Sequence, residues 1–209
     1  MAKTLDREET KAIQGEVGAT QDGIWGPETQ LLFEKHYNLT PPPVATPTGE
    51  PPSPDYSSMV AYYGQPGDTS KHTRIAIPYP MRLSWDLTSV VTRITCHQKV
   101  AEPLSAMLEM WLKHFGTEGI ERHGLDLYGG CYNNRTVRNG TSTSKHAWAA
   151  AIDIDPVRNG NSTPWAADKV GEPGWGNMPV DAVEIAKSLK WKHGGDEWGR
   201  DAMHFQYTK

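Results

Sequence analysis

Proline is concentrated in one short stretch of the chain and divides it. Seven of the 14 residues in segment 41–54 are proline. Proline lacks a backbone N–H donor and fixes φ, so this run cannot lie inside a helix or a sheet. We therefore predict an extended linker over residues 41–57. The linker separates a small N-terminal module, residues 1–40, from a larger domain, residues 58–209.

The charge balance and the apolar content exclude two classes of partner. The 209 residues include 21 Lys plus Arg and 25 Asp plus Glu, which gives a net charge of −4. There is no basic excess to bind nucleic acid. The apolar runs are far shorter than the roughly 20 residues that cross a bilayer, so we expect no membrane anchor. The charged first residues also lack the apolar middle of a secretory signal peptide.

The N-terminal module has the pattern of two helices joined by a turn. Leu5, Ile13 and Val17 form a weak apolar stripe that predicts a helix over residues 5–17. Asp22-Gly23 indicates a turn, and Pro27 suits the first position of a second helix. The apolar side of that second helix would consist of Leu31, Leu32, Phe33 and Tyr37.

The turn resembles the signature of the small peptidoglycan-binding module of cell-wall hydrolases. The matching positions are Ile13-Gln14, Val17-Gly18, Asp22-Gly23, Trp25-Gly26 and Thr29. This resemblance implies a module that holds the protein on the cell wall. The alternative, a helical hairpin that only caps the following domain, stays open.

The larger domain mixes helices and strands in blocks. Apolar residues at helical spacing predict one helix over residues 97–115, ending at Gly116, and a second over 180–190. Residues 73–77 and 89–94 have strand composition, and Pro78 and Pro80 should end the first of these runs. Such blocks favour an α+β fold over a repeated βαβ architecture.

Two further strands carry metal-binding side chains. Ile152 and Ile154 alternate with Asp153 and Asp155, which predicts a half-buried strand with both carboxylates on one face. Residues 203–207 alternate in the same way and present His204. His146, Asp153 and His204 would supply the two imidazoles and one carboxylate of a catalytic zinc site. The spacing alone also fits a helical turn carrying His146 and Asp153, or three unrelated polar residues.

A separate carboxylate is needed for proton transfer during hydrolysis. Asp201 lies three residues before His204, so we place it in the turn before the strand. From that turn its side chain can lean over the ion without binding it.

The order of these residues resembles a group of zinc peptidases. The group comprises lysostaphin-type enzymes, D-alanyl-D-alanine peptidases and the hedgehog signalling domain. In this chain the positions of the pattern are occupied by Ser144, His146, Ala149, Ala151, Asp153, Asp201 and His204. Segments 79–86, 128–135 and 194–198 further resemble the branch of VanY-like carboxypeptidases and phage L-alanyl-D-glutamate endopeptidases.

The resemblance implies a fold and a role for each residue. The fold is a small antiparallel sheet flanked by helices. His146, Asp153 and His204 would bind Zn²⁺, Asp201 would be the general base, and Arg135 and Ser144 would contact substrate. One departure is Ala149, which stands where the group usually has glycine, so a positive φ at this position would strain the chain.

We therefore expect a zinc-dependent peptidoglycan peptidase of the phage endolysin type that cuts the L-Ala–D-Glu bond. It would be a monomer, made in the host cytoplasm without a signal peptide and acting on the wall after release. Three alternatives stay open. They are a D-alanyl-D-alanine carboxypeptidase with the same site, a non-catalytic zinc-containing wall-binding protein, and a thiol hydrolase using Cys131 with His146. Otherwise Cys96 and Cys131 should be two buried thiols or one disulfide.

Overall fold

The computed structural model describes residues 6–24, 29, 36, 49–138 and 140–209. Contacts divide the chain into two units, residues 1–44 and 45–209, and the division falls inside the predicted linker. Within the described residues, none of the helices combines the length and the apolar character needed to cross a membrane.

In the N-terminal unit, helix α1 (Arg7–Val17) confirms the predicted helix. The side chain of Asp6 caps it, and Gly18 ends it in the left-handed region. The buried Gln14 amide donates to Asp22 Oδ1, to the Ile24 carbonyl and to Thr29 Oγ1, and its oxygen accepts from Gly23 N–H. The signature positions therefore share one hydrogen-bond network. Trp25 and most of the predicted second helix lie outside the described residues, so the module stays a prediction.

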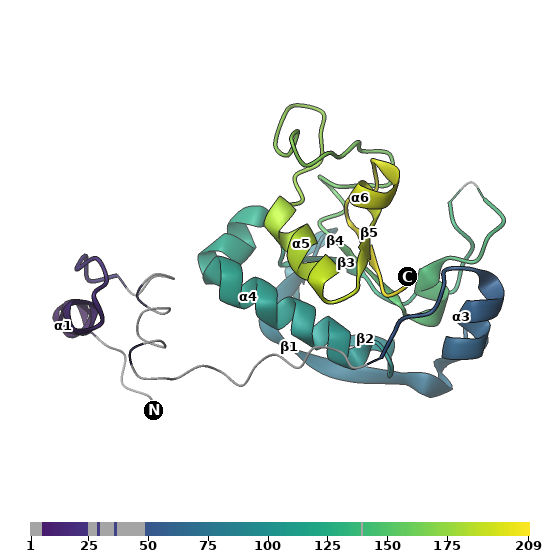
Figure 1. Ribbon diagram of the computed structural model, residues 1–209, viewed down its shortest axis with the longest axis horizontal. Coiled ribbons are helices and arrows are strands. Elements are labelled where there is room, and N and C mark those ends of the chain that lie inside the picture. Colours follow the sequence, from purple (N-terminus) through teal and green to yellow (C-terminus); the bar gives the residue numbers. More distant parts are fainter. Residues whose placement is uncertain (1–5, 25–28, 30–35, 37–48, 139) are drawn as a thin grey trace. The chain divides into compact units, whose positions relative to one another are not determined.

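The larger unit is an α+β domain built on a six-stranded sheet with strand order β2-β1-β3-β4-β6-β5 (Figure 1). The strands are β1 (His72–Leu83), β2 (Asp86–His97), β3 (Leu127–Gly130), β4 (Ala151–Ile154), β5 (Lys192–His193) and β6 (His204–Gln206). The prediction of an antiparallel sheet is wrong at one place, because β1 and β3 pair in parallel. This mixed pairing arises because helix α4 (Ala101–His123) connects the β1–β2 hairpin to β3.

The prolines do not end the first strand as predicted. Strand β1 continues through Pro78 and Pro80, and its register against β2 shifts between Ala76 and Met81. An irregularity of this kind is where a strand tolerates residues that lack an N–H donor. The β1–β2 hairpin is therefore much longer than the two predicted runs.

Helix α4 packs along the sheet and supplies much of the core. The Trp111 ring meets Phe205 of β6 edge to face at a centroid distance of 5.3 Å, and both side chains are fully buried. The helix also extends beyond its predicted end. Gly116 has φ 63° and ψ 174°, which kinks the helix, but helical turns resume and end at His123 before the left-handed Gly124.

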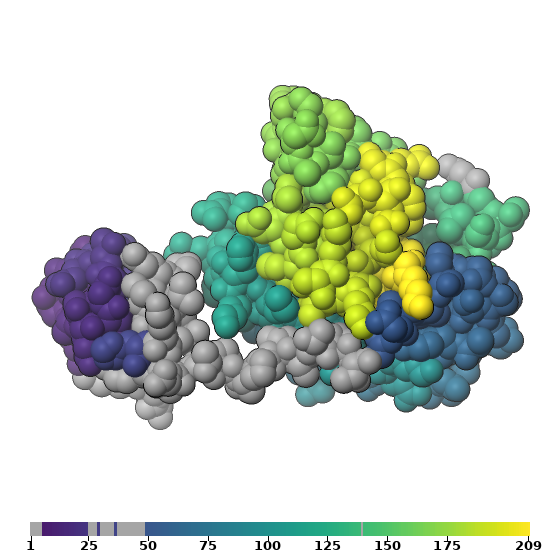
Figure 2. Space-filling model, viewed as in Figure 1, coloured from purple at the N-terminus to yellow at the C-terminus, as the bar shows by residue number. Residues whose placement is uncertain are grey.

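The remaining helices close the domain around the C-terminus. Helix α5 (Val180–Ser188) follows Pro179 as predicted, and the short α6 (Gly194–Trp198) precedes β6. Two 3₁₀ turns, η1 (Thr69–Lys71) and η2 (Lys145–Trp148), lie in loops. The loop between β4 and α5 projects from the domain surface (green in Figure 2).

The described end of the proline-rich segment packs against this domain. Pro51 and Pro52 are buried, and the Pro52 carbonyl accepts a hydrogen bond of 2.8 Å from Lys209 N–H. Helix α3 (Tyr56–Tyr63) then begins inside the range predicted as linker. The Tyr63 hydroxyl donates to the Tyr207 carbonyl at 2.8 Å. These bonds hold the chain leaving the linker beside the C-terminal segment.

Candidate metal centre

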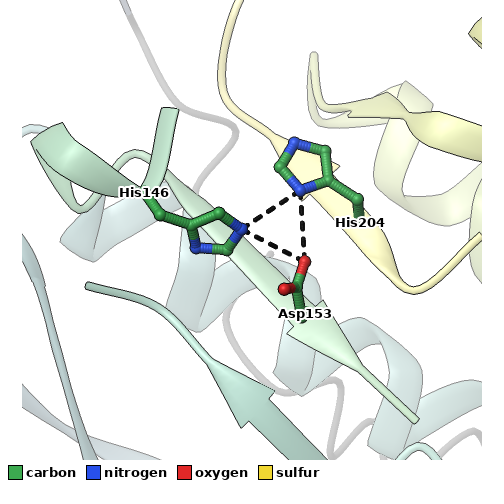
Figure 3. A group of neighbouring side chains, drawn as sticks. All are labelled: His146, Asp153 and His204. Atoms are coloured by element: carbon green, nitrogen blue, oxygen red, sulfur yellow. Dashed lines mark hydrogen bonds and ion pairs between the residues drawn. The ribbon is translucent and has the colours of Figure 1, made fainter. Parts of the chain in front are cut away.

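His146, Asp153 and His204 converge on one point (Figure 3). His146 Nε2 lies 3.2 Å from Asp153 Oδ1 and 3.2 Å from His204 Nδ1, and the third side of this triangle is 3.1 Å. All three residues are buried. The three residues predicted as ligands therefore lie close enough to share one metal ion, although they are far apart along the chain.

His146 is held by its 3₁₀ turn and by one carbonyl. The Ser144 hydroxyl accepts a hydrogen bond from the His146 N–H at 3.4 Å and so begins η2. The ring Nδ1 lies 2.8 Å from the Cys131 carbonyl, an acceptor. Nδ1 must therefore carry the ring proton, which leaves the Nε2 lone pair directed at the cluster.

Sheet register brings the other two ligands together. Asp153 of β4 pairs directly with His204 of β6, so their side chains lie on one face of the sheet. His204 Nε2 lies 3.2 Å from Gln206 Oε1, and the Gln206 amide donates to Thr208 Oγ1 at 2.8 Å. Nε2 therefore carries the proton and Nδ1 faces the cluster. Gln206 and Thr208 were not predicted, although their even spacing from His204 on a strand was a usable signal.

The donor set fits a zinc ion. Two imidazoles and a carboxylate are the ligands of many catalytic zinc sites, which leave a fourth position open. Ligand atoms about 2.0–2.1 Å from a tetrahedral ion lie about 3.4 Å apart, close to the separations observed. Burial alone would raise the pKa of Asp153, but the adjacent His146 and His204 rings lower it below its usual value. The carboxylate is therefore in its ligating, ionised form.

Asp201 lies in the turn before β6, where it was predicted. Its φ is 62°, and its carbonyl accepts from His204 N–H at 3.0 Å. Its Oδ1 is buried without a hydrogen-bond partner among the described residues. Burial raises the pKa of Asp201, against the opposing charge of His204. A half-buried carboxyl group just before His204, with one buried oxygen that has no partner among the described residues, suits a group that accepts and returns a proton.

Asp155 does not share this face with Asp153, contrary to the prediction. It follows the end of β4 with φ 51°, and its side chain pairs with Arg158 and accepts from the Asn159 amide. Strand β4 ends at Ile154, one residue earlier than the Ile/Asp alternation predicted. The Asp155 carboxylate therefore points toward Arg158 and not toward the cluster.

The two predicted substrate-contacting residues lie at the edge of the site. Ser144 is buried, and its hydroxyl caps η2. Arg135 is half-buried, its Nη1 donates to the Thr136 carbonyl, and its own carbonyl accepts from Ser144 N–H at 3.1 Å. Among the described residues, neither side chain bonds the clustered atoms His146 Nε2, Asp153 Oδ1 or His204 Nδ1. A substrate contact by Ser144 or Arg135 stays a prediction.

Cys96 and Cys131 are both buried, and they form no disulfide. Burial raises the pKa of both thiols, to about 12 for Cys96. His146 contacts the Cys131 carbonyl, whereas the Cys131 thiol lies 3.7 Å from the Ala149 carbonyl. A protonated thiol without a base is a poor nucleophile, so this geometry argues against the thiol hydrolase.

Ala149 has a positive φ, which is the strained backbone conformation that glycine would adopt more easily at this position of the motif. Its φ is 51° and its ψ is 36°, and the left-handed region costs a non-glycine residue roughly 1–2 kcal/mol. Ala149→Gly should therefore cost less stability than Ala151→Gly, by about 1–2 kcal/mol, since both methyl groups are fully buried but Ala151 lies on an extended strand. Urea unfolding of the two variants measures this difference. Equal losses would mean that Ala149 carries no strain.

His193 supports the Asp201 turn and should make stability depend on pH. Its Nε2 bonds the Ala202 carbonyl at 2.9 Å, and burial lowers its pKa from 6.5 to about 4. The unfolded chain binds a proton more readily between these values, so stability should fall by about 3 kcal/mol as the pH drops from 6.5 to 4. Urea unfolding of metal-free protein at several pH values checks this. His193→Gln should flatten the decline, and an unchanged slope would exclude His193 as its source.

A comparison with known families agrees with this site. Residues 138–207 match the sequence model of a family described as D-alanyl-D-alanine carboxypeptidase. The matched segment contains all three clustered ligands and Asp201. The family match supports the interpretation that this domain is a hydrolase, a metallopeptidase related to enzymes that act on peptidoglycan. No curated protein and no solved structure gave a significant match.

Proposed function

We propose that the larger domain is a zinc-dependent peptidase that cleaves the peptide stem of peptidoglycan at the L-Ala–D-Glu bond. The observation that carries this proposal is the triangle of His146 Nε2, Asp153 Oδ1 and His204 Nδ1, together with the buried Oδ1 of Asp201 in the turn before His204. The family match over the same residues supports the peptidase class and the substrate polymer.

The residues of the site would divide the work of hydrolysis. A zinc ion held by the three ligands would polarise the peptide carbonyl and acidify a water molecule. Asp201 would accept a proton from the attacking water and deliver it to the departing amine. Gln206 and the Cys131 carbonyl keep the two imidazoles in the required tautomers. Arg135 would hold a carboxylate of the substrate or the developing oxyanion.

A D-alanyl-D-alanine carboxypeptidase is the second candidate, because the matching family carries that description. The two enzymes would share the ligands and the base and differ only in the bond placed over them. We favour the endopeptidase because a tethering module suits an enzyme that lyses an insoluble wall. In this proposal the domain acts as a monomeric endolysin, and the N-terminal unit raises its local concentration on peptidoglycan.

A non-catalytic wall-binding protein is the third candidate. It would need the zinc ligands but not a carboxyl group with a buried, unpartnered oxygen just before His204. The position of Asp201 and its Oδ1 therefore favour an enzyme.

Mass spectrometry of purified peptidoglycan after digestion identifies the bond. We expect new amino termini at D-Glu and fragments separated from the glycan strand. Release of free D-Ala with intact cross-linked stems would instead identify the carboxypeptidase. Unaltered peptidoglycan in the presence of zinc would contradict both enzymes.

A further inference from the structure

A hollow of about 520 Å³ lies beside the β1–β2 hairpin and carries positive charge. It is lined by Arg74, Val90, Val91, Thr92, Arg93, Thr95, Tyr128 and Tyr132. Its volume falls in the range of small-molecule and peptide sites. Among the described residues that line it, the two arginines are the only charged ones, and none is a carboxylate.

The two guanidinium groups share one face of the hairpin. Arg74 pairs with Thr95, and Arg93 lies two residues before Thr95 on β2. The two arginines are therefore diagonal neighbours, with their Cα atoms roughly 7–8 Å apart. Residues 94 and 75 alternate to the other face, where Ile94 is buried. Two like charges so placed repel each other unless an anion lies between them.

Neither arginine has a partner within the described residues. In the described part of the chain, Arg74 and Arg93 form no ion pair or hydrogen bond, whereas Arg82 binds Asp126 and Arg158 binds Asp155. The other arginines of this sheet region are thus satisfied by carboxylates. The guanidinium forks of Arg74 and Arg93 remain available for an external carboxylate.

The hollow adjoins the candidate metal centre. Tyr132 follows Cys131, whose carbonyl holds the His146 ring, and Gly130 pairs with Asp153. Gly129 and Gly130 put no side chain between Tyr128 and Cys131. A Cβ at Gly129 would lie 2.9 Å from Asp153 Cβ, so this strand passes close to the ligand. β3 pairs with β1 on one side and β4 on the other, so a bound peptide would pass from the hollow to the cluster over the face of β3 at these glycines.

We propose that Arg74 and Arg93 bind a carboxylate of the peptide stem and so determine which stems are cleaved. This inference rests on the proposed function, because it assigns the hollow to the substrate of the same site. The carboxylate belongs either to the interior of the stem, at D-Glu, or to the C-terminus of the stem. Both sources present the same chemistry to a pair of guanidinium groups.

Stem peptides that differ only in one carboxylate test the proposal. The three substrates are the free acid, the peptide amidated at the D-Glu α-carboxyl, and the peptide amidated at its C-terminus. For the wild type, one of the amides should show KM raised about tenfold with kcat within about twofold, and the amide affected identifies the source. Arg74→Gln and Arg93→Gln should raise KM for the free acid about tenfold and lose this discrimination. Arg122→Gln, at an exposed position on α4, should behave as wild type.

Binding to the zinc-loaded Asp201→Asn protein separates this inference from the proposed function. If the wild type cleaves no stem peptide, the proposed function fails. The assignment of the hollow to a carboxylate is still supported if the free acid binds about tenfold more tightly to Asp201→Asn than to Asp201→Asn with both arginines replaced by glutamine. Equal KM values and equal affinities with and without the two arginines would overturn the inference. The variant with Arg74→Lys and Arg93→Lys keeps both charges and should bind the free acid more tightly than the variant with both arginines replaced by glutamine. Such a recovery excludes a folding defect as the cause of the lost affinity.

Discussion

Asp201→Asn should reduce peptide hydrolysis by about 10²- to 10⁴-fold while the chain keeps its zinc. The substitution removes the group proposed to accept the proton from water and changes no ligand. Asparagine also tolerates the left-handed backbone of this residue, at φ 62°, better than alanine does. Stem-peptide turnover and the zinc content of the purified protein are the two measurements.

A nearby carboxylate serves as the matched control for Asp201. Asp196 is exposed on α6 and pairs with Lys187, away from the three ligands. Asp196→Asn should keep turnover within about twofold of the wild type. If Asp201→Asn kept full turnover, Asp201 would not be the base. If it lost zinc, Asp201 would help to hold the ion.

His204→Ala should abolish both zinc binding at micromolar concentrations and turnover. It removes one of three ligands and leaves the Asp153 carboxylate with His146 alone. Metal binding to the folded state also stabilises it, so the rise in Tm on adding zinc should disappear in this variant. Competition with a chelating dye measures the affinity, and thermal unfolding with and without zinc measures the stabilisation.

Two further variants should lower the zinc affinity less than His204→Ala does, one by an intermediate amount and one not at all. Gln206→Leu keeps all three ligands but removes the acceptor that fixes the His204 tautomer, so zinc affinity should fall about 10- to 100-fold. His114→Gln removes an exposed histidine that contacts Asp181, and zinc affinity should not change. A His204→Ala protein that binds zinc like the wild type would exclude His204 as a ligand.

The sequence was sufficient to predict that His146, Asp153 and His204 would cluster, because local patterns that the structure preserves orient them. Strand alternation oriented Asp153 and His204, and the turn before β6 placed Asp201. The tautomers of the imidazoles could not be predicted in the same way. They depend on the Cys131 carbonyl, a backbone group whose approach to His146 is set by tertiary packing.

The wrong predictions share a physical cause, which is that packing outweighed local preference. Gly116 has a non-helical backbone conformation, but α4 resumes after it and the buried Ile120 packs in the core. Pro78 and Pro80 lack donors, yet the shifted register of β1 accommodates them. The hollow with Arg74 and Arg93 has no sequence signature, because its lining comes from the hairpin, from β3 and from the loop after β3.

The central claim is that one ion binds where three distant side chains converge. A crystal structure of the zinc-loaded protein, with anomalous scattering measured at the zinc edge, tests it most directly. The account predicts one zinc peak, about 2.0–2.2 Å from His146 Nε2, Asp153 Oδ1 and His204 Nδ1. A zinc peak bound by other residues, or none at this triangle, would contradict it.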